Sequence, residues 1–343
     1  MSEYSLKQIK STVSALSEPS IEMLQVNGLT MKVTSMGYGP LVVLCHGFPE
    51  LAISWRSQIA ALAAAGYRAV APDMRGFGGT TAPSDVSDYT MLHLVGDMVE
   101  LVGALGEKQA VIIGHDWGAP VAWNCALLRP DLFTAVVGMS VPFVPIGTSD
   151  ILSNLRLAGI DDFYLQYFQT PGVAEAELER DVASSIRQIH YSASGNGPDT
   201  IAFGMLQSGK GILDNTVEPE TLPDWLSEQD IAQYAAEFSR TGFRGGLNWY
   251  RNITRSWELM KPWRGQVIHQ PSLFIAGERD DVLKFPNALA NVDNFSVTLP
   301  GMRGCHILPE AGHWIQRERA TMVNNLLIEF LDSLQNENQA LGR

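Results

Sequence analysis

The sequence has few cysteines, no long apolar run and no signal-like beginning. Its three cysteines, Cys45, Cys125 and Cys305, are too few and too scattered for a disulfide framework or a zinc site. No apolar run approaches the roughly 18 residues that a membrane-spanning helix needs. Residues 1–10 are polar and lack the apolar core of a signal peptide. We therefore expect a cytoplasmic protein without membrane insertion.

Positive charge is also scarce. The 343 residues include 24 Lys and Arg against 37 Asp and Glu, a net charge of −13, which argues against nucleic acid as a partner. No paired histidine motif indicates a metal, and we expect no cofactor. A hydrophobic fraction of 45% is ample for a large core. The length suits two domains or one large domain with an insertion, and the protein is expected to be a monomer or a homodimer.

Short apolar runs alternate with segments of helical periodicity, and this alternation predicts an α/β fold with a doubly wound parallel sheet. Strands are expected at residues 21–26, 31–33, 41–45, 68–71, 110–113, 135–139 and 271–276. The first two form a hairpin around Asn27 and Gly28. Helices are expected at residues 53–65, 92–105 and 322–334.

The alternation breaks near Pro142 and resumes at Pro271. Aromatic-rich, helix-like stretches lie between these prolines, at residues 163–168, 175–190, 230–238 and 247–257. Such an insertion predicts a helical cap over the carboxyl edge of the sheet. The chain then divides into an N-terminal extension (1–20), a first core segment (21–142), the cap (143–265) and a second core segment (266–343).

The sharpest motif is Gly-His-Asp-Trp-Gly at residues 114–118, directly after a predicted strand and before a helix. Its spacing is that of a nucleophile elbow, with Asp116 where a serine would stand. The flanking glycines fit a sharp turn that leaves no room for side chains. A carboxylate there would displace a leaving group from saturated carbon and form an ester on the protein. The alternative is that Asp116 only caps the following helix.

Hydrolysis of such an ester needs a general base and a group that orients it. His313 is favoured as the base because it lies late in the chain, before the final helix, in the order nucleophile–acid–histidine. The orienting acid should follow the strand at residues 271–276. Asp280 is far enough past the strand to turn inward, and Asp281 and Glu278 remain alternatives.

An oxyanion hole needs two N–H donors. One is expected from Trp117, the residue after the nucleophile, and the other from Phe48 in the His-Gly-Phe-Pro loop at residues 46–49. Pro49 suits a tight turn with a cis bond. Phe48, Trp117, Trp314 and aromatic residues of the cap are expected to line an apolar pocket.

Taken together, the motifs of residues 21–335 resemble the soluble epoxide hydrolases of the α/β-hydrolase superfamily, in particular the C-terminal hydrolase domain of the mammalian enzymes. The resemblance rests on residues 46–50 (His-Gly-Phe-Pro-Glu), 73–78 (Asp-Met-Arg-Gly-Phe-Gly), 114–118, and the lid-like segments 168–177 and 242–252. It implies an α/β-hydrolase fold: an eight-stranded, mostly parallel sheet flanked by helices, with an inserted helical cap.

The resemblance also implies a reaction. In that family two lid tyrosines protonate the epoxide oxygen as the ring opens. The second lid segment places Tyr250 in this role, and Tyr164 fits the other position, with Tyr167 as its rival. The implied activity is a detoxification-type conversion of hydrophobic epoxides to vicinal diols. It proceeds through an alkyl ester on Asp116 that His313 hydrolyses with water.

Two other functions are compatible with parts of the pattern. A haloalkane or haloacid dehalogenase would share Asp116 and His313, but a halide leaves without a proton and needs N–H donors rather than phenols, so Tyr250 favours the epoxide. A ligand receptor is the third hypothesis, because hydrolase folds are sometimes reused for binding. The presence of every residue that the catalytic scheme requires argues against it.

Overall fold

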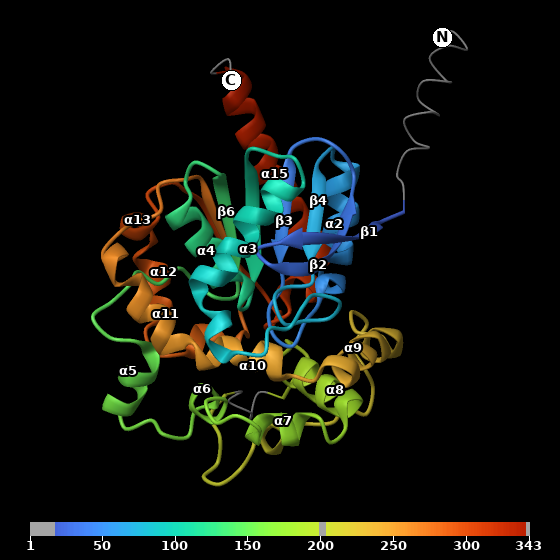
Figure 1. Ribbon diagram of the computed structural model, residues 1–343, viewed down its shortest axis with the longest axis vertical. Helices are drawn as coiled ribbons and strands as arrows, with labels where there is room; N and C mark the ends of the chain where they lie inside the picture. The colour runs from blue at the N-terminus through green and yellow to red at the C-terminus, as the bar shows by residue number, and fades with distance from the viewer. Residues whose placement is uncertain (1–17, 199–203, 341–343) are drawn as a thin grey trace.

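A single sheet organises the molecule (Figure 1). The computed structural model describes residues 18–198 and 204–340, and in this part of the chain eight strands pair in the order β1-β2-β4-β3-β5-β6-β7-β8. The pairs β1–β2 and β2–β4 are antiparallel, and all other pairs are parallel. The strands are β1 (Ser20–Val26), β2 (Leu29–Met36), β3 (Leu41–Cys45), β4 (Arg68–Pro72), β5 (Ala110–His115), β6 (Phe133–Met139), β7 (Ser272–Gly277) and β8 (Met302–Leu308).

The central strands are almost entirely apolar because both of their faces are covered. Every residue of β3 is buried, and alternate side chains join opposite cores: Val43 and Cys45 on one face, Val42 and Leu44 on the other. The edge strand β1, by contrast, is largely exposed. The predicted strand positions are confirmed. Strands β3 and β5 pair directly and in parallel, so their carboxyl ends lie side by side.

Helices cover both faces of the sheet. On one side α3 (Met91–Ala104) and α4 (Gly118–Leu128) pack against the sheet, with α12 (Ala288–Asp293) and α13 (Phe295–Thr298) beside the same core. On the other side lie α2 (Arg56–Ala64) and α15 (Ala320–Ala340), which contact each other. No helix in the described part of the chain is long and apolar enough to cross a membrane.

A group of helices separates β6 from β7 in the chain and gathers at the lower end of the view in Figure 1. They are α5 (Ile151–Leu157), α6 (Tyr164–Tyr167), α7 (Val173–Leu178), α8 (Val182–Ser192), α9 (Glu228–Thr241), α10 (Arg244–Arg251) and α11 (Ile253–Met260). Short 3₁₀ turns accompany them and the sheet: η1 (Ala52–Trp55), η2 (Val86–Tyr89), η3 (Leu213–Asn215), η4 (Lys261–Trp263) and η5 (Asp281–Lys284). The division into core and cap at residues 142 and 265 stays a prediction.

Three predicted helices differ from the structure. Residues 175–190 form two helices, α7 and α8, because Asp181 caps the start of the second by accepting the Ser184 N–H. Residues 247–257 break at Asn252, whose side chain donates to the carbonyls of Val86 and Asn248. The segment 53–65 begins as the 3₁₀ turn η1 before α2 starts.

Two other elements were incompletely predicted. No residue range was predicted for strand β8 because it sits at the sheet edge, where residues 302–307 alternate between half-buried and exposed and include Arg303 and His306. Helix α15 extends to Ala340, beyond the predicted end at residue 334. The predicted N-terminal extension lies largely outside the described residues.

Candidate active site

The turn after β5 holds Asp116 in a conformation that requires its glycine neighbours. Asp116 has a φ of +50°, which is uncommon for a residue with a side chain. A Cβ on Gly114 would lie 1.9 Å from the Gly118 carbonyl oxygen, and one on Gly118 would lie 2.0 Å from the Cys45 carbonyl oxygen. Only glycine fits either position, so the spacing seen in the sequence has a steric cause.

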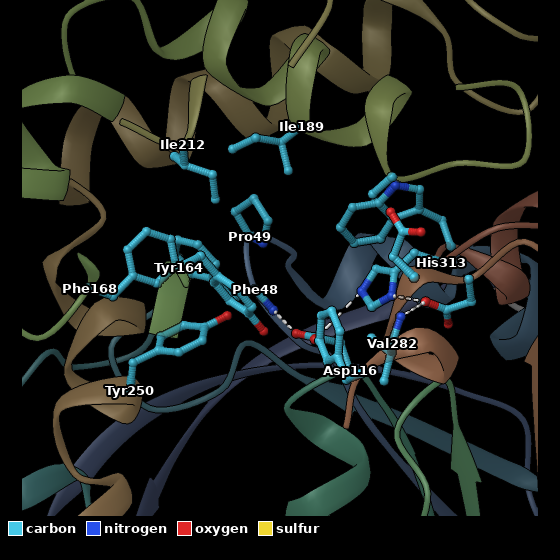
Figure 2. A pocket seen from close by; sticks show the side chains of 15 residues that line it. Phe48, Pro49, Asp116, Tyr164, Phe168, Ile189, Ile212, Tyr250, Val282 and His313 are labelled. Carbon is cyan, nitrogen blue, oxygen red and sulfur yellow. Dashed lines mark hydrogen bonds and ion pairs between the residues drawn. The ribbon is translucent and has the colours of Figure 1, made fainter. Parts of the chain in front are cut away.

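The Asp116 carboxylate is largely buried between two loops. Its Oδ1 accepts the Phe48 backbone N–H at 2.7 Å, and its Oδ2 lies 3.5 Å from Nε2 of His313 (Figure 2). The Phe48–Pro49 bond is cis, as expected. A Cβ on Gly47 would lie 2.2 Å from Asp116 Oδ1. The loop after β3 therefore approaches the carboxylate closely enough to present a backbone donor.

His313 stands between two carboxylates. Its Nδ1 lies 3.1 Å from Oδ1 of Asp280, which also accepts the Val282 N–H at 3.0 Å and is fully buried. The Ser140 hydroxyl oxygen lies 3.0 Å from the same Nδ1. The structure thus brings Asp116, His313 and Asp280 into one line, in the arrangement of a nucleophile, a base and an orienting acid.

The neighbouring charges set the pKa values of His313 and Asp280. Burial alone would lower the pKa of His313, but the carboxylates of Asp280 and Asp116 raise it well above its usual value. Burial would likewise raise the pKa of Asp280, yet the charge and hydrogen bond of His313 keep it below its usual range. The two carboxylates therefore favour the cationic form of His313, and a loss of charge on Asp116 would lower its pKa.

Two tyrosines face Asp116 from the helices beyond the sheet. Tyr164 of α6 and Tyr250 of α10 have ring centroids 5.9 Å apart, and their side chains point toward Asp116 in Figure 2. Burial, followed by the charge of Asp116, raises the pKa of both phenols above the usual value. Both hydroxyls therefore stay protonated at neutral pH and are able to donate a proton or a hydrogen bond.

Known proteins share this sequence and fold. Residues 40–175 match the family model of the alpha/beta hydrolase fold. Epoxide hydrolase A of Mycobacterium tuberculosis is 42% identical over 321 residues, which cover 92% of this chain and 98% of that protein. The chain belongs to the epoxide hydrolase family. The α/β-hydrolase fold with its eight-stranded, mostly parallel sheet is confirmed with it.

Two further relatives place the chain within this family. Bifunctional epoxide hydrolase 2 of Mus musculus is 39% identical over 307 residues, covering 89% of this chain but 54% of that protein. The solved structure of an epoxide hydrolase from an endophytic Streptomyces is 43% identical, with a TM-score of 0.88, and the match covers 93% of this chain and 96% of that one. The resemblance read from the motifs is therefore confirmed.

The alternatives for the orienting acid and the first tyrosine are engaged elsewhere. The Asp281 carboxylate pairs with Lys284 at 2.7 Å, and the exposed Glu278 accepts the Glu310 N–H at 3.3 Å. The Tyr167 hydroxyl donates to Glu177 at 2.7 Å. The geometry favours Asp280 and Tyr164 for the two roles.

Two cavities meet at Asp116. The smaller, about 40 Å³, lies on the side of His313, and the larger, about 340 Å³, lies on the side of Trp117. Asp116, Tyr164 and Tyr250 line both cavities, and most of the remaining wall surface is apolar. A substrate placed at Asp116 would extend one arm into each cavity.

The residues predicted to bind substrate divide between these cavities. Phe48 and Trp314 line the smaller one. Trp117 lines the larger one, where its ring meets Tyr250 edge-on at 5.0 Å between centroids. Phe285, which lines both cavities, was not predicted because no motif marks the loop after β7 as part of a pocket.

Two buried polar groups at the site were also missed. The Ser140 hydroxyl, directly after the end of β6, is one of them and lies next to Nδ1 of His313. Glu50, quoted as part of a motif, lies 2.7 Å from Nδ1 of His115, whose Nε2 lies 2.7 Å from the His313 carbonyl oxygen. In residues 18–198 and 204–340, no group of three or more His, Cys, Asp or Glu side chains is arranged to hold a metal ion.

Proposed function

We propose that this protein is an epoxide hydrolase that converts hydrophobic epoxides to vicinal diols through an ester on Asp116. One observation carries the proposal: a buried carboxylate faces His313 on one side and two protonated phenols, Tyr164 and Tyr250, on the other. The relatives named epoxide hydrolases support the same reaction. Water is the co-substrate, and no cofactor takes part.

The first half-reaction opens the ring. A lone pair of the Asp116 carboxylate attacks one epoxide carbon, and the ring C–O bond breaks with its electron pair on the epoxide oxygen. Tyr164 or Tyr250 transfers its proton to that oxygen. The products are a hydroxyl group, a neutral alkyl ester and one tyrosinate.

The second half-reaction hydrolyses the ester. Water attacks Cγ of Asp116 while its proton passes to Nε2 of His313, and the negative charge that develops on the carbonyl oxygen of the ester is stabilised by the amides of Phe48 and Trp117. The bond between Cγ and the ester oxygen then breaks, and the diol oxygen takes the proton from His313. The remaining carboxyl proton passes to His313, which returns the site to its starting state.

The charge on Asp116 couples the two steps. While Asp116 is ionised, it helps to raise the pKa of His313, which stays protonated. Esterification removes that charge, so the pKa of His313 falls, the imidazolium gives its proton to the tyrosinate, and the neutral imidazole becomes available as a base. The base is therefore released only when there is an ester to hydrolyse.

The cavities define the substrate class. Their apolar walls exclude charged groups, and the difference between about 340 and about 40 Å³ favours an epoxide with one large apolar substituent and one small one. We further propose that residues 143–265 act as the cap that closes these cavities. The enzyme is proposed to be cytoplasmic and to act as a monomer or homodimer.

A parallel assay separates this function from its rivals. The purified protein is incubated with aryl and alkyl epoxides and, separately, with haloalkanes, while diol and halide are followed. Freshly prepared Asp116→Asn is the control, because a neutral amide is a poor nucleophile. We expect diol that disappears in the control. Release of halide without diol would indicate a dehalogenase. Tight binding of a ligand without turnover would support a receptor.

A further inference from the structure

A buried glutamate outside the reacting groups binds the backbone around His313. Glu318, in α14 (Ile315–Glu318), is 8% exposed. Its Oε2 accepts the N–H groups of Gly195 at 2.8 Å and Gly312 at 2.9 Å, and its Oε1 accepts the Trp314 N–H at 3.0 Å. The two residues that flank His313 in the chain are thus both hydrogen-bonded to one carboxylate.

The third donor comes from a distant segment. Gly195 follows the end of α8, in the helical region between β6 and β7. In the same turn, the Ala193 carbonyl accepts the N–H of His313 itself at 2.9 Å. A Cβ on Gly312 would lie 2.3 Å from the Gly195 backbone nitrogen, so the two segments are in direct contact. The turn after α8 and the loop of the base are joined through Glu318.

We propose that Glu318 is a positioning residue that holds His313 in place for hydrolysis of the ester, by fixing its loop against the turn after α8. The inference rests on the proposed function, because it assigns Glu318 to the second half-reaction. The simpler interpretation is a cap of the short helix α14. That role accounts for the bond to Trp314 but not for the bonds to Gly195 and Gly312.

Because three N–H groups converge on the side chain of Glu318, both of its terminal atoms must accept hydrogen bonds. An ionised carboxylate meets this requirement, and its hydrogen bonds are the strong, charge-assisted kind. In Glu318→Gln an NH₂ group must face at least one of these donors, so at least one bond is lost and two N–H groups oppose each other. The loop that carries His313 then loses its fixed position.

We expect the loss of these hydrogen bonds in Glu318→Gln to slow only the second half-reaction, hydrolysis of the ester. Asp116 is held by the turn after β5 and by Phe48, and the two tyrosines by α6 and α10, none of which bonds Glu318. Ring opening therefore keeps its geometry, while attack by water depends on the position of His313. Hydrolysis becomes slower than ester formation, and the ester accumulates.

The test compares Glu318→Gln with Glu310→Gln. Glu310 lies three residues before His313, and its exposed carboxylate is 3.9 Å from Arg319. We expect kcat of Glu318→Gln to fall about 10- to 100-fold, the usual effect of losing a group that orients a reacting residue. KM should fall with it, so that kcat/KM stays within about threefold. Intact-protein mass spectrometry during turnover should show a species heavier by one epoxide, and Glu310→Gln should behave like the wild type.

Each outcome decides the proposal. Ester hydrolysis within twofold of the wild type in a folded Glu318→Gln protein would overturn it, and so would an equal loss in both half-reactions, which indicates general damage. Should Glu318→Gln fail to fold, Glu318→Asp keeps the charge but is one methylene shorter, and a smaller loss confined to hydrolysis is expected. A wild-type protein that forms no diol and no ester would instead refute the proposed function.

Discussion

At Asp116 the backbone takes a conformation that aspartate rarely adopts, with close contacts that only Gly114 and Gly118 permit. A strained φ of this kind costs on the order of 1–3 kcal/mol and persists when the surrounding structure enforces it. The gain is that the carboxylate meets the Phe48 amide and His313 at once. Because both glycines are needed for steric reasons, their spacing was sufficient to predict the sharp turn that presents Asp116, the residue proposed as the nucleophile.

The tyrosines provide the first prediction at the residue scale. Tyr164→Phe and Tyr250→Phe should each slow ester formation about 10- to 100-fold, because either phenol still donates a proton, and the double variant should lose about 10²- to 10⁴-fold. Tyr167→Phe is the matched control, since its hydroxyl binds Glu177, and it should stay within twofold. Single-turnover measurement of ester formation checks this. A large effect of Tyr167→Phe with none of Tyr164→Phe would reverse the assignment.

Asp280 leads to a pH prediction. Its carboxylate raises the pKa of His313, so Asp280→Asn should lower that pKa, and the acid limb of ester hydrolysis should move to lower pH. The plateau rate should fall about 10²- to 10⁴-fold, because Nδ1 of His313 loses the acceptor that orients it. Rates of ester decay measured between pH 5 and about 9 test both effects. Glu278→Gln is the control. If the acid limb of Asp280→Asn lay at the same pH as that of the wild type, Asp280 would not be the group that raises the pKa of His313.

At the scale of elements, the sequence predicted best the strands that are buried on both faces. Strands β3, β5 and β7 are almost entirely apolar and were placed within two residues. Strand β8 lies at an edge, its exposed and inward-facing residues both mix polar and apolar types, and its range was not predicted. The split of residues 175–190 depends on the cap at Asp181, a local competition that periodicity does not reveal. The sizes of the two cavities and the contacts of Ser140 and Glu318 depend on tertiary packing, for which a single sequence holds no signal.

A pair of glycine variants tests the elbow as an element. Gly118→Ala would place its Cβ 2.0 Å from the Cys45 carbonyl oxygen, and we expect it to destabilise the protein by about 1–3 kcal/mol or more. Gly103→Ala in α3 meets no atom within 4 Å and should stabilise it by about 0.5–1 kcal/mol, because alanine is the better helix former. Urea denaturation measures both. Equal stabilities would disprove the steric explanation of the elbow.

At the scale of the whole molecule, a buried ionic cluster joins the helices of the inserted segment to the sheet domain. Asp230 of α9 pairs with Arg56 of α2 and with Arg317 of α14, which lies beside Glu318. Arg317 also donates to the Trp225 carbonyl at 2.9 Å. Segments far apart in the chain therefore depend on one carboxylate.

Removing that carboxylate should weaken the whole fold. Asp230→Asn leaves two guanidinium groups without their partner, and a loss of about 3–5 kcal/mol is typical when a buried pair is broken. Because Arg56 is partly exposed, we expect the lower end of that range. Asp131→Asn, which removes an exposed pair with Arg129, is the control and should change little. Urea denaturation at pH 7 measures the difference.

The ion pairs of Asp230 should also make the stability of the protein depend on pH. Although burial alone would raise it, the pKa of Asp230 lies below its usual value because of Arg56, Ser227 and Arg317. The unfolded chain therefore binds the proton more readily, so this contribution is present above about pH 4 and is lost as the pH falls through the folded-state pKa. Asp230→Asn should lose less stability than the wild type on acidification. An identical acid slope in both proteins would contradict this.

The central claim is that the new oxygen of the diol first belongs to Asp116. A single turnover with excess enzyme in ¹⁸O-labelled water tests it most directly, with mass spectrometry of the diol and of the peptide that contains Asp116. Because water attacks Cγ, we predict that the first diol carries no label and that the Asp116 carboxylate gains one ¹⁸O. Labelled diol together with an unlabelled Asp116 would mean that water attacks the epoxide directly, and the ester mechanism would be wrong.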